Sequence, residues 1–348
     1  MTRLWPYLLL TGVPALLPAA AWAGGGAEAP VLFRDGGWLA ALLLLAGSCV
    51  LAVLGLSRHC PWYAGLRRAI TRGEIVPWYQ PVVCGERGVT GGAEVLARRL
   101  MPDGEVRLPG TFIPEATRRG LMVPMMCRLI QQVTADMLAT PLPPGFRLSV
   151  NADASCLGAP AFARECRTLN RVLARQQASL TLEITEQTCL TLTPSLQALL
   201  SSLRNEGITV ALDDFGTGWS GPLLLAALPV DYVKLDAVFT RGAGLPADEG
   251  RDAGDDYLRM AERLIALVRD TGAVVVAEGI EAHRQRLWLL AHGVTWQQGW
   301  LYARPMPAGD FHSWMGACVA QMPLRPHALP VTPAEGAEHT PSLKEHTE

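Results

Sequence analysis

Between about residue 70 and residue 317, short runs of apolar and often β-branched residues alternate with longer segments whose apolar residues recur every three or four positions. The short runs are typical of buried strands, and the longer segments are typical of helices. Their alternation predicts repeated strand–helix units around a parallel sheet. The runs that we interpret as strands begin at Val76, Gly91, Phe146, Leu180, Ile208, Asp231, Ala273 and Thr295.

Helical periodicity occupies the intervals between these runs. The clearest examples are residues 119–138, 194–205, 256–271 and 281–291. After Met322 the sequence turns to Pro, Thr, Glu and His without an apolar period. Such a composition cannot bury enough apolar surface to order itself, so we expect residues 318–348 to be a disordered tail.

Residues 37–56 form a charge-free apolar run of the length that crosses a bilayer as a helix, about 20 residues. A hydrophobic core helix is the alternative interpretation. The run is followed by Arg58, Arg67, Arg68 and Arg72, whereas residues 24–36 carry a single arginine. Because positive charge favours the cytoplasmic side, we expect a juxtamembrane linker at 57–69 and a cytoplasmic domain at 70–317. For a bacterial chain the membrane would be the inner membrane.

The first apolar segment leaves two interpretations open. Residues 4–23 follow Arg3 and end in Ala21-Trp22-Ala23, which resembles the cleavage site of a secretory signal. Residues 1–23 are therefore a signal peptide or a first transmembrane helix. In either case we expect residues 24–36 to be a short periplasmic segment.

Composition excludes several classes of function. The net charge of −2 comes from 30 basic and 32 acidic residues, which provides no broad basic field for long nucleic acid. The 8 cysteines are scattered and form no Cys-x-x-Cys pair, so we interpret them as reduced thiols and not as zinc ligands.

Polar residues occur at or near the ends of most predicted strands, where apolar residues are expected. They are Glu94, Asn151, Glu183, Asp213, Asp214, Lys234, Glu278 and Gln298. Any one of them could be a helix cap or a solvated loop residue. In an eight-stranded α/β barrel, however, the carboxyl ends of all strands meet at one mouth, where active sites are built. The recurrence therefore predicts a (β/α)8 TIM-type barrel with these side chains gathered in one site.

Such a cluster of acids requires a counter-charge. Five carboxylates in one mouth would raise one another's pKa values unless cations neutralised them. Because the set offers carboxylates and the Asn151 amide without His or Cys, it suits Mg²⁺ or Mn²⁺ better than zinc. Two such ions could activate a water for displacement at phosphorus. Lys234 could stabilise anionic charge, orient the nucleophile or pair with the acids.

Residues 66–317 resemble the EAL-domain phosphodiesterases in a long ordered series of motifs. The matching segments are Tyr79-Gln80-Pro81, Glu94-Val95-Leu96-Ala97-Arg98, Asn151, Glu183-Ile184-Thr185-Glu186, Asp213-Asp214-Phe215-Gly216-Thr217-Gly218, Lys234-Leu235-Asp236, Glu278-Gly279-Ile280-Glu281 and Gln298-Gly299. The resemblance implies a barrel enzyme that hydrolyses cyclic di-GMP to the linear dinucleotide pGpG, with two metal ions and as a homodimer.

The resemblance also implies roles for individual residues. It implies metal ligands at Glu94, Asn151, Glu183, Asp213 and Asp214; water and metal contacts at Lys234, Glu278 and Gln298; substrate contacts at Gln80 and Arg98; and loop support from Glu186, Gly216, Gly218 and Glu281. A guanidinium fork at Arg98 suits a phosphodiester, although a solvated surface charge is the alternative.

The sequence departs from the family pattern at a few positions. Val95 replaces the alanine of the signature, Arg99 stands where a tryptophan is usual, Thr117 replaces a common acid, and Trp219 replaces a tyrosine. None of these changes removes an expected ligand, so we favour an active hydrolase. The alternatives are a catalytically weak cyclic di-GMP sensor that acts through an unknown partner, and a protein that only reuses the barrel for interaction.

Overall fold

The computed structural model describes residues 46–48, 61–185, 193–217, 221–241 and 251–319. The chain divides into two compact units, residues 1–60 and residues 61–348. Of the first unit only 46–48, which are helical, are described. No helix within the described residues has the length and apolar character needed to cross a membrane. The remainder of the predicted span at 37–56 and most of the predicted tail lie outside them.

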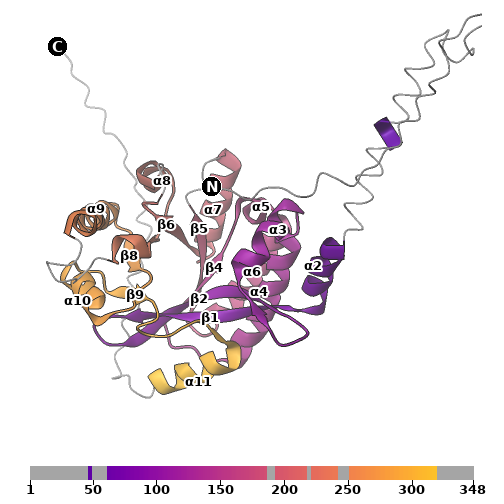
Figure 1. The fold of residues 1–348 in the computed structure, drawn as a ribbon, viewed down its shortest axis with the longest axis horizontal. Helices are drawn as coiled ribbons and strands as arrows, with labels where there is room; N and C mark the ends of the chain where they lie inside the picture. The colour runs from indigo at the N-terminus through magenta and orange to yellow at the C-terminus, as the bar shows by residue number, and fades with distance from the viewer. Residues whose placement is uncertain (1–45, 49–60, 186–192, 218–220, 242–250, 320–348) are drawn as a thin grey trace, which may run out of the picture. The chain divides into compact units, whose positions relative to one another are not determined.

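The second unit is a closed barrel of eight strands flanked by two short strands (Figure 1). The strands are β1 (Ile75–Cys84), β2 (Val89–Leu100), β3 (Val106–Arg107), β4 (Arg147–Asn151), β5 (Ser179–Thr185), β6 (Thr209–Phe215), β7 (Tyr232–Leu235), β8 (Val274–Ala277), β9 (Trp296–Gln298) and β10 (Met306–Pro307). All eight predicted strands are confirmed. β9 is shorter than its apolar run because the chain turns after Gln298.

The expectation of a fully parallel barrel needs one correction. Strands β2, β4, β5, β6, β7, β8 and β9 run parallel, but β1 pairs antiparallel with both β2 and β9. The connection from β1 to β2 is a short turn at residues 85–88, and so short a connection permits only an antiparallel pair. The barrel therefore closes through a strand of reversed direction.

Helices surround this barrel. They are α2 (Pro61–Arg72), α3 (Ile113–Arg118), α4 (Met122–Ala139), α5 (Ala154–Leu157), α6 (Pro160–Ala174), α7 (Pro194–Asn205), α8 (Gly221–Ala227), α9 (Arg251–Asp270), α10 (His283–Ala291) and α11 (Ala308–Val319), with 3₁₀ turns η2 (Pro109–Thr111) and η4 (Ala237–Phe239). The four predicted helical segments are confirmed within a few residues at their ends.

The predicted linker at 57–69 differs from the structure, because helix α2 begins at Pro61. Leu66, Ala69 and Ile70 on this helix are buried, and the helix contacts α4. Apolar residues three and four apart on one face explain why the segment folds onto the barrel. Residues 61–69 therefore form part of the folded unit.

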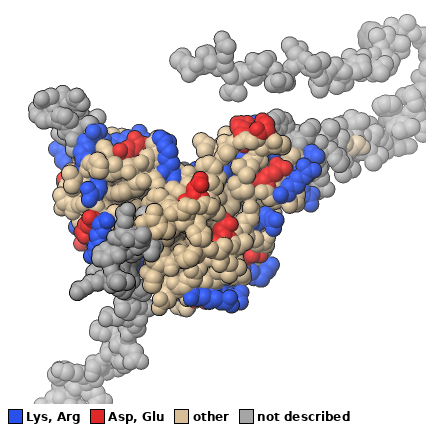
Figure 2. All heavy atoms as spheres, turned by 90° about the horizontal axis from the view of Figure 1, so that it is seen from below, with Lys and Arg blue, Asp and Glu red and all other residues tan. Residues whose placement is uncertain are grey.

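The main core lies between the strands and the helices. Helix α4 buries Met125, Leu129 and Val133, and packs beside α6, as Figure 1 shows. Burial raises the pKa of the Cys166 thiol on α6 to about 12, which keeps it protonated. On the face seen in Figure 2, basic and acidic groups lie next to one another in several places, and much of the remaining surface is uncharged.

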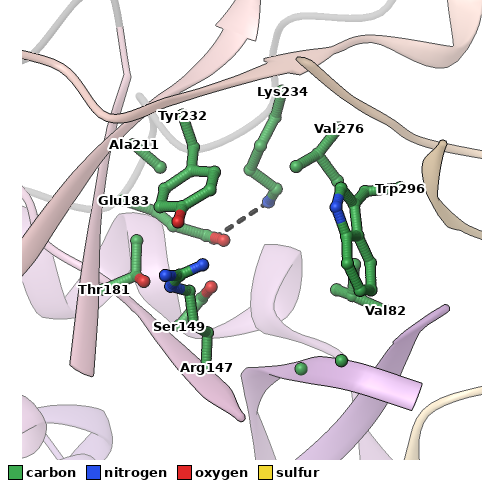
Figure 3. Close-up of a pocket in the computed structure, with 12 residues that line it drawn as sticks. Val82, Arg147, Ser149, Thr181, Glu183, Ala211, Tyr232, Lys234, Val276 and Trp296 are labelled. Atoms are coloured by element: carbon green, nitrogen blue, oxygen red, sulfur yellow. Dashed lines mark hydrogen bonds and ion pairs between the residues drawn. The ribbon is translucent and has the colours of Figure 1, made fainter. Parts of the chain in front are cut away.

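A second, smaller core fills the barrel interior below the mouth (Figure 3). Arg147, Tyr232 and Trp296 point into a cavity of about 40 Å³, and the Arg147 guanidinium lies 4.8 Å from the centre of the Tyr232 ring. Small residues make room for these large side chains. A Cβ on Gly91 would overlap the Trp296 ring, and a Cβ on Gly92 would lie 2.5 Å from the Arg147 carbonyl oxygen.

We expect Gly92→Ala to lower the free energy of unfolding by about 1–3 kcal/mol, because the added methyl group meets backbone of the adjacent strand and cannot be accommodated by a rotamer change. Urea unfolding of the full chain in detergent, followed by circular dichroism, measures this change. Gly316→Ala on α11 is the matched control, since its Cβ would meet no atom within 4 Å. Equal stability of the two variants would contradict the packing argument.

Candidate active site

The polar residues predicted at the strand ends lie together at one mouth of the barrel. Parallel strands place their carboxyl ends at the same edge, so residues far apart in sequence become neighbours. A cavity of about 400 Å³ opens there. Its lining includes the predicted residues Gln80, Glu94, Asp213, Asp214, Lys234, Glu278, Glu281 and Gln298.

Lys234 on β7 is the centre of this arrangement. Its Nζ lies 2.7 Å from Glu278, 2.9 Å from Glu183, 3.2 Å from Asp213 and 3.3 Å from Glu94. Only 3% of the residue is exposed. One buried ammonium group therefore serves four carboxylates from four different strands or strand ends.

Glu94 on β2 is held by three donors. The side-chain amide of Gln298 donates to it at 2.8 Å, that of Asn151 at 3.0 Å, and Lys234 at 3.3 Å. The Gln298 amide also donates to Gln80 at 3.2 Å. Fixed donors on both sides leave the Glu94 carboxylate little freedom to rotate.

The acids around Lys234 differ in the direction in which their pKa values are shifted. Burial acts to raise the pKa of Glu94, but the charge of Lys234 and the three hydrogen bonds outweigh it and leave that pKa below its ordinary value. Burial and the charge of Glu94 raise the pKa of Glu183 well above its usual range. Burial also raises the pKa of Glu278, to about 8. The pKa of Lys234 lies well above normal, because four carboxylates outweigh its burial.

Two of the acids around Lys234 also lie close to Asp214 at the end of β6. Asp213, Asp214 and Glu278 can each place one carboxylate oxygen within 4.8 Å of the others. Asp214 has a left-handed backbone with φ of 54°, and its N–H donates to the Asp213 carboxylate at 3.0 Å. Such a conformation is uncommon outside glycine but tolerated by aspartate. It directs two consecutive carboxylates to the same mouth, whereas a regular strand would direct them to opposite faces of the sheet.

The loop after β6 requires glycine at one predicted position. Gly216 has φ of +91°, and a Cβ there would lie 2.9 Å from the Phe239 ring. Left-handed backbone and close packing therefore both act against a side chain. Glu186 and Gly218, which were also predicted to support the site, lie outside the described residues.

Arg98 does not reach the cavity. It is buried on β2, donates from Nη1 to the Ala97 carbonyl at 2.9 Å, and lies 5.5 Å from the centre of the Trp78 ring. Gln80, the other predicted substrate contact, does line the mouth.

Trp300 and Asp236 also line the mouth, although the sequence did not single out Trp300 and indicated Asp236 only as part of a matched motif, without a role of its own. The Trp300 ring is 54% exposed and is covered by the Arg304 guanidinium at 3.8 Å. Asp236 accepts a hydrogen bond from the Val238 N–H at 2.7 Å and so begins the turn η4. Each lies two positions after a predicted strand-end residue, Lys234 or Gln298, and this spacing was the signal that could have identified them.

A second cavity of about 370 Å³ adjoins the mouth and shares Glu94 and Leu96 with it. Its other lining is mainly apolar and includes Pro109, Ile113 and Met126. The charged mouth and this apolar cavity therefore form adjacent parts of one concave region.

Comparison with known proteins identifies the family. The model of the EAL domain matches residues 64–305. The chain is 40% identical over 244 residues to the probable cyclic di-GMP phosphodiesterase PdeG of Escherichia coli K12, and 37% identical over 248 residues to the cyclic di-GMP phosphodiesterase PdeL of the same organism. These matches cover 69% and 70% of this chain but 46% and 66% of the two relatives, so the chain spans about half to two thirds of their length.

Solved structures agree with this assignment. The phosphodiesterase PaMucR in complex with c-di-GMP aligns with 29% identity and a TM-score of 0.60, covering 71% of this chain and 97% of that one. An EAL domain protein from Listeria monocytogenes has the same fold at 23% identity and a TM-score of 0.59, covering 72% of this chain and 96% of that one. With the family model matched over most of the barrel, the chain belongs to the EAL domain family.

Proposed function

We propose that this protein is a metal-dependent phosphodiesterase that adds water across one phosphodiester bond of cyclic di-GMP and releases pGpG. The observation that carries the proposal is the cluster of four buried carboxylates around Lys234 at the barrel mouth. The names of PdeG and PdeL, and the c-di-GMP complex of PaMucR, support the choice of substrate.

The donor set fits a hard divalent cation such as Mg²⁺ or Mn²⁺. Asp213, Asp214 and Glu278 offer three convergent carboxylates, and the Gln298 Oε1 is a buried oxygen without a hydrogen-bond partner in the described part of the chain. Glu94, Asn151 and Glu183 supply further oxygen donors, enough for a pair of ions. When bound, divalent ions would lower the pKa of a water molecule and neutralise charge on the phosphodiester.

The protein's own residues would prepare this site for reaction. Lys234 retains its proton because its pKa is raised, and its ammonium group would donate to the attacking water or to a phosphate oxygen. Glu94 stays ionised and fixed by its donors, so its lone pairs point in a constant direction. The Gln80–Gln298 hydrogen bond links the side chains of β1 and β9 on the remaining side of the mouth.

The substrate would extend from the mouth into the adjoining apolar cavity. We infer that a guanine base occupies this cavity against Ile113 and Met126, while Gln80 contacts the sugar–phosphate ring at the mouth. Arg98 would need a new rotamer to bind phosphate, and its present contact with the Ala97 carbonyl is the interaction that it would exchange.

We also propose that residues 37–56 anchor the enzyme in a membrane with the barrel on the cytoplasmic side, and that it acts as a homodimer. The charge-free run and the arginines after it support the membrane location. The family resemblance is the basis for the dimer. Placement at the membrane would restrict turnover to cyclic di-GMP near that surface.

Glu94→Gln should abolish hydrolysis, with a fall in kcat of about a thousandfold, because it removes an anionic oxygen that stabilises the site by several kcal/mol. Conversion of cyclic di-GMP to pGpG by the full chain in detergent is followed by chromatography, with Mg²⁺, with Mn²⁺ and with chelator. Glu206→Gln is the control, since Glu206 pairs with Arg167 on the surface. Unaltered turnover in Glu94→Gln or in chelator would contradict the proposal; tight nucleotide binding without turnover in the parent would favour a sensor.

Metal binding should be coupled to pH through Glu278. Its pKa in the folded protein, about 8, lies above the unfolded value of about 4.3. Between these values the folded state holds a proton that the unfolded state has released, so the stability of the metal-free protein falls as pH rises. A divalent ion must displace that proton.

We therefore expect Mg²⁺ to raise the Tm more at pH 8 than at pH 6, by at least about 3 °C, in differential scanning fluorimetry of the full chain. Glu278→Gln should remove most of this difference between the two pH values. An equal Mg²⁺ effect at both pH values in the parent protein would show that Glu278 does not take part.

The membrane proposal predicts that the full chain, expressed in a bacterium, stays in the membrane fraction after washing with alkaline carbonate. A variant in which Leu43 and Leu44 are both changed to Arg should be released, because each charge costs about 2.5–3.5 kcal/mol at the centre of a bilayer. Leu43→Ala with Leu44→Ala is the matched control and should remain bound. Extraction of the parent by carbonate would overturn the proposal.

A further inference from the structure

Four arginines line a cavity on the outer wall of the barrel, away from the mouth. The cavity measures about 370 Å³ and lies between α2, the end of β2, β3, η2 and α3. Its charged lining consists of Arg99, Arg107, Arg118, Arg119 and Glu115, and Leu66 of α2 closes one side. We name it the arginine pocket. Its volume is within the usual range of small-molecule sites, about 300–1,000 Å³.

The acids near the pocket do not balance its positive charge. Glu115 is shared between Arg118 and Arg119, and Arg107 pairs with the half-exposed Glu105 at 3.3 Å. In the described part of the chain, three of the four arginines therefore share two carboxylates, and positive charge is in excess. Ion pairs as exposed as Arg107–Glu105 contribute little, so Arg107 can change partners at small cost.

Arg99 adds to the excess of positive charge. It lies directly opposite Arg107 in the antiparallel pair of β2 and β3. Like charges in directly opposed positions destabilise a sheet. The Arg99 Nε is buried and has no hydrogen-bond partner, and the described residues offer Arg99 no carboxylate within ion-pair distance. A buried N–H donor of this kind gains free energy from any oxygen that reaches it.

We propose that the arginine pocket binds a phosphate group, and that the phosphate is the headgroup of an anionic phospholipid. Arg99 and Arg107 form the floor of the site, where two planar guanidinium forks can hold one phosphate between them. Guanidinium groups form paired hydrogen bonds with phosphate oxygens, and the phosphate charge would remove the repulsion between the two strands.

The choice of a lipid rests on the neighbouring helix and on the proposed membrane anchor. Helix α2 forms one wall of the pocket and carries the exposed residues Arg67, Arg68 and Arg72, of which Arg72 has Glu74 at 3.9 Å. In the sequence, α2 begins five residues after the apolar run ends at Leu56, a distance that an extended chain covers in at most about 18 Å. Basic clusters so close to a span are typical of sites for anionic lipid headgroups.

Native mass spectrometry of the full chain in nonionic detergent would test this site without nucleotide, so that its outcome is independent of the proposed hydrolysis. The probes are phosphatidylglycerol, zwitterionic phosphatidylcholine, and inorganic phosphate. We expect phosphatidylglycerol to bind in preference to phosphatidylcholine, and Arg99→Gln and Arg107→Gln each to weaken that binding at least tenfold. Arg171→Gln, which removes an exposed arginine of α6 outside the pocket, is the matched control and should change nothing.

Other outcomes would overturn the proposal in distinct ways. An equal loss of lipid in Arg99→Gln and Arg171→Gln would mean that general positive charge, and not the pocket, attracts the lipid. Binding of inorganic phosphate that depends on Arg99, without preference for phosphatidylglycerol, would overturn the lipid as the source. Absence of all three probes from the parent protein would overturn the site itself. Circular dichroism of Arg99→Gln establishes that a loss of binding is not a loss of fold.

Discussion

A single buried ammonium group lies among the four carboxylates at the mouth of the barrel and offsets part of their negative charge. Without Lys234, the carboxylates of Glu94, Glu183, Asp213 and Glu278 would face one another in a site from which water is largely excluded. Removing one partner from such a buried arrangement typically costs about 3–5 kcal/mol. Burial, the neighbouring carboxylates and this lysine together give the acids different pKa values. The site therefore combines a fixed positive charge with acids that still hold protons, and a divalent ion could take the place of those protons.

Much of this arrangement could be predicted from local sequence patterns. All eight barrel strands and the gathering of Glu94, Asn151, Glu183, Asp213, Lys234 and Gln298 followed from apolar runs that end in polar residues. The apolar runs alone do not specify the direction of β1, although the short connection at residues 85–88 is a sequence feature that could have indicated it. The rotamer of Arg98 and the left-handed backbone of Asp214 depend on contacts made across the fold.

The arginine pocket could not be predicted from the sequence either, because it too depends on how strands pair. Arg99 was noted only as a departure from a family pattern, and Arg107 drew no attention, because β3 has just two residues and shows no period. Their opposition arises from the register of β2 with β3. Strand alternation also explains how one strand serves both regions. Arg99 is five positions after Glu94, and residues an odd number of positions apart face opposite sides of the barrel wall.

The reversed strand β1 has a consequence for the order in which the protein can assemble. Its pairing with β2 is local, but its pairing with β9 joins Val82 to Gln298, and the mouth depends on the same closure through the Gln80–Gln298 hydrogen bond. Contacts so distant in sequence form late, after the loop entropy between them has been overcome. Nearly the whole barrel must be synthesised before β9 can pair with β1 and complete the mouth. The proposed hydrolysis would therefore begin only when synthesis of the barrel is complete.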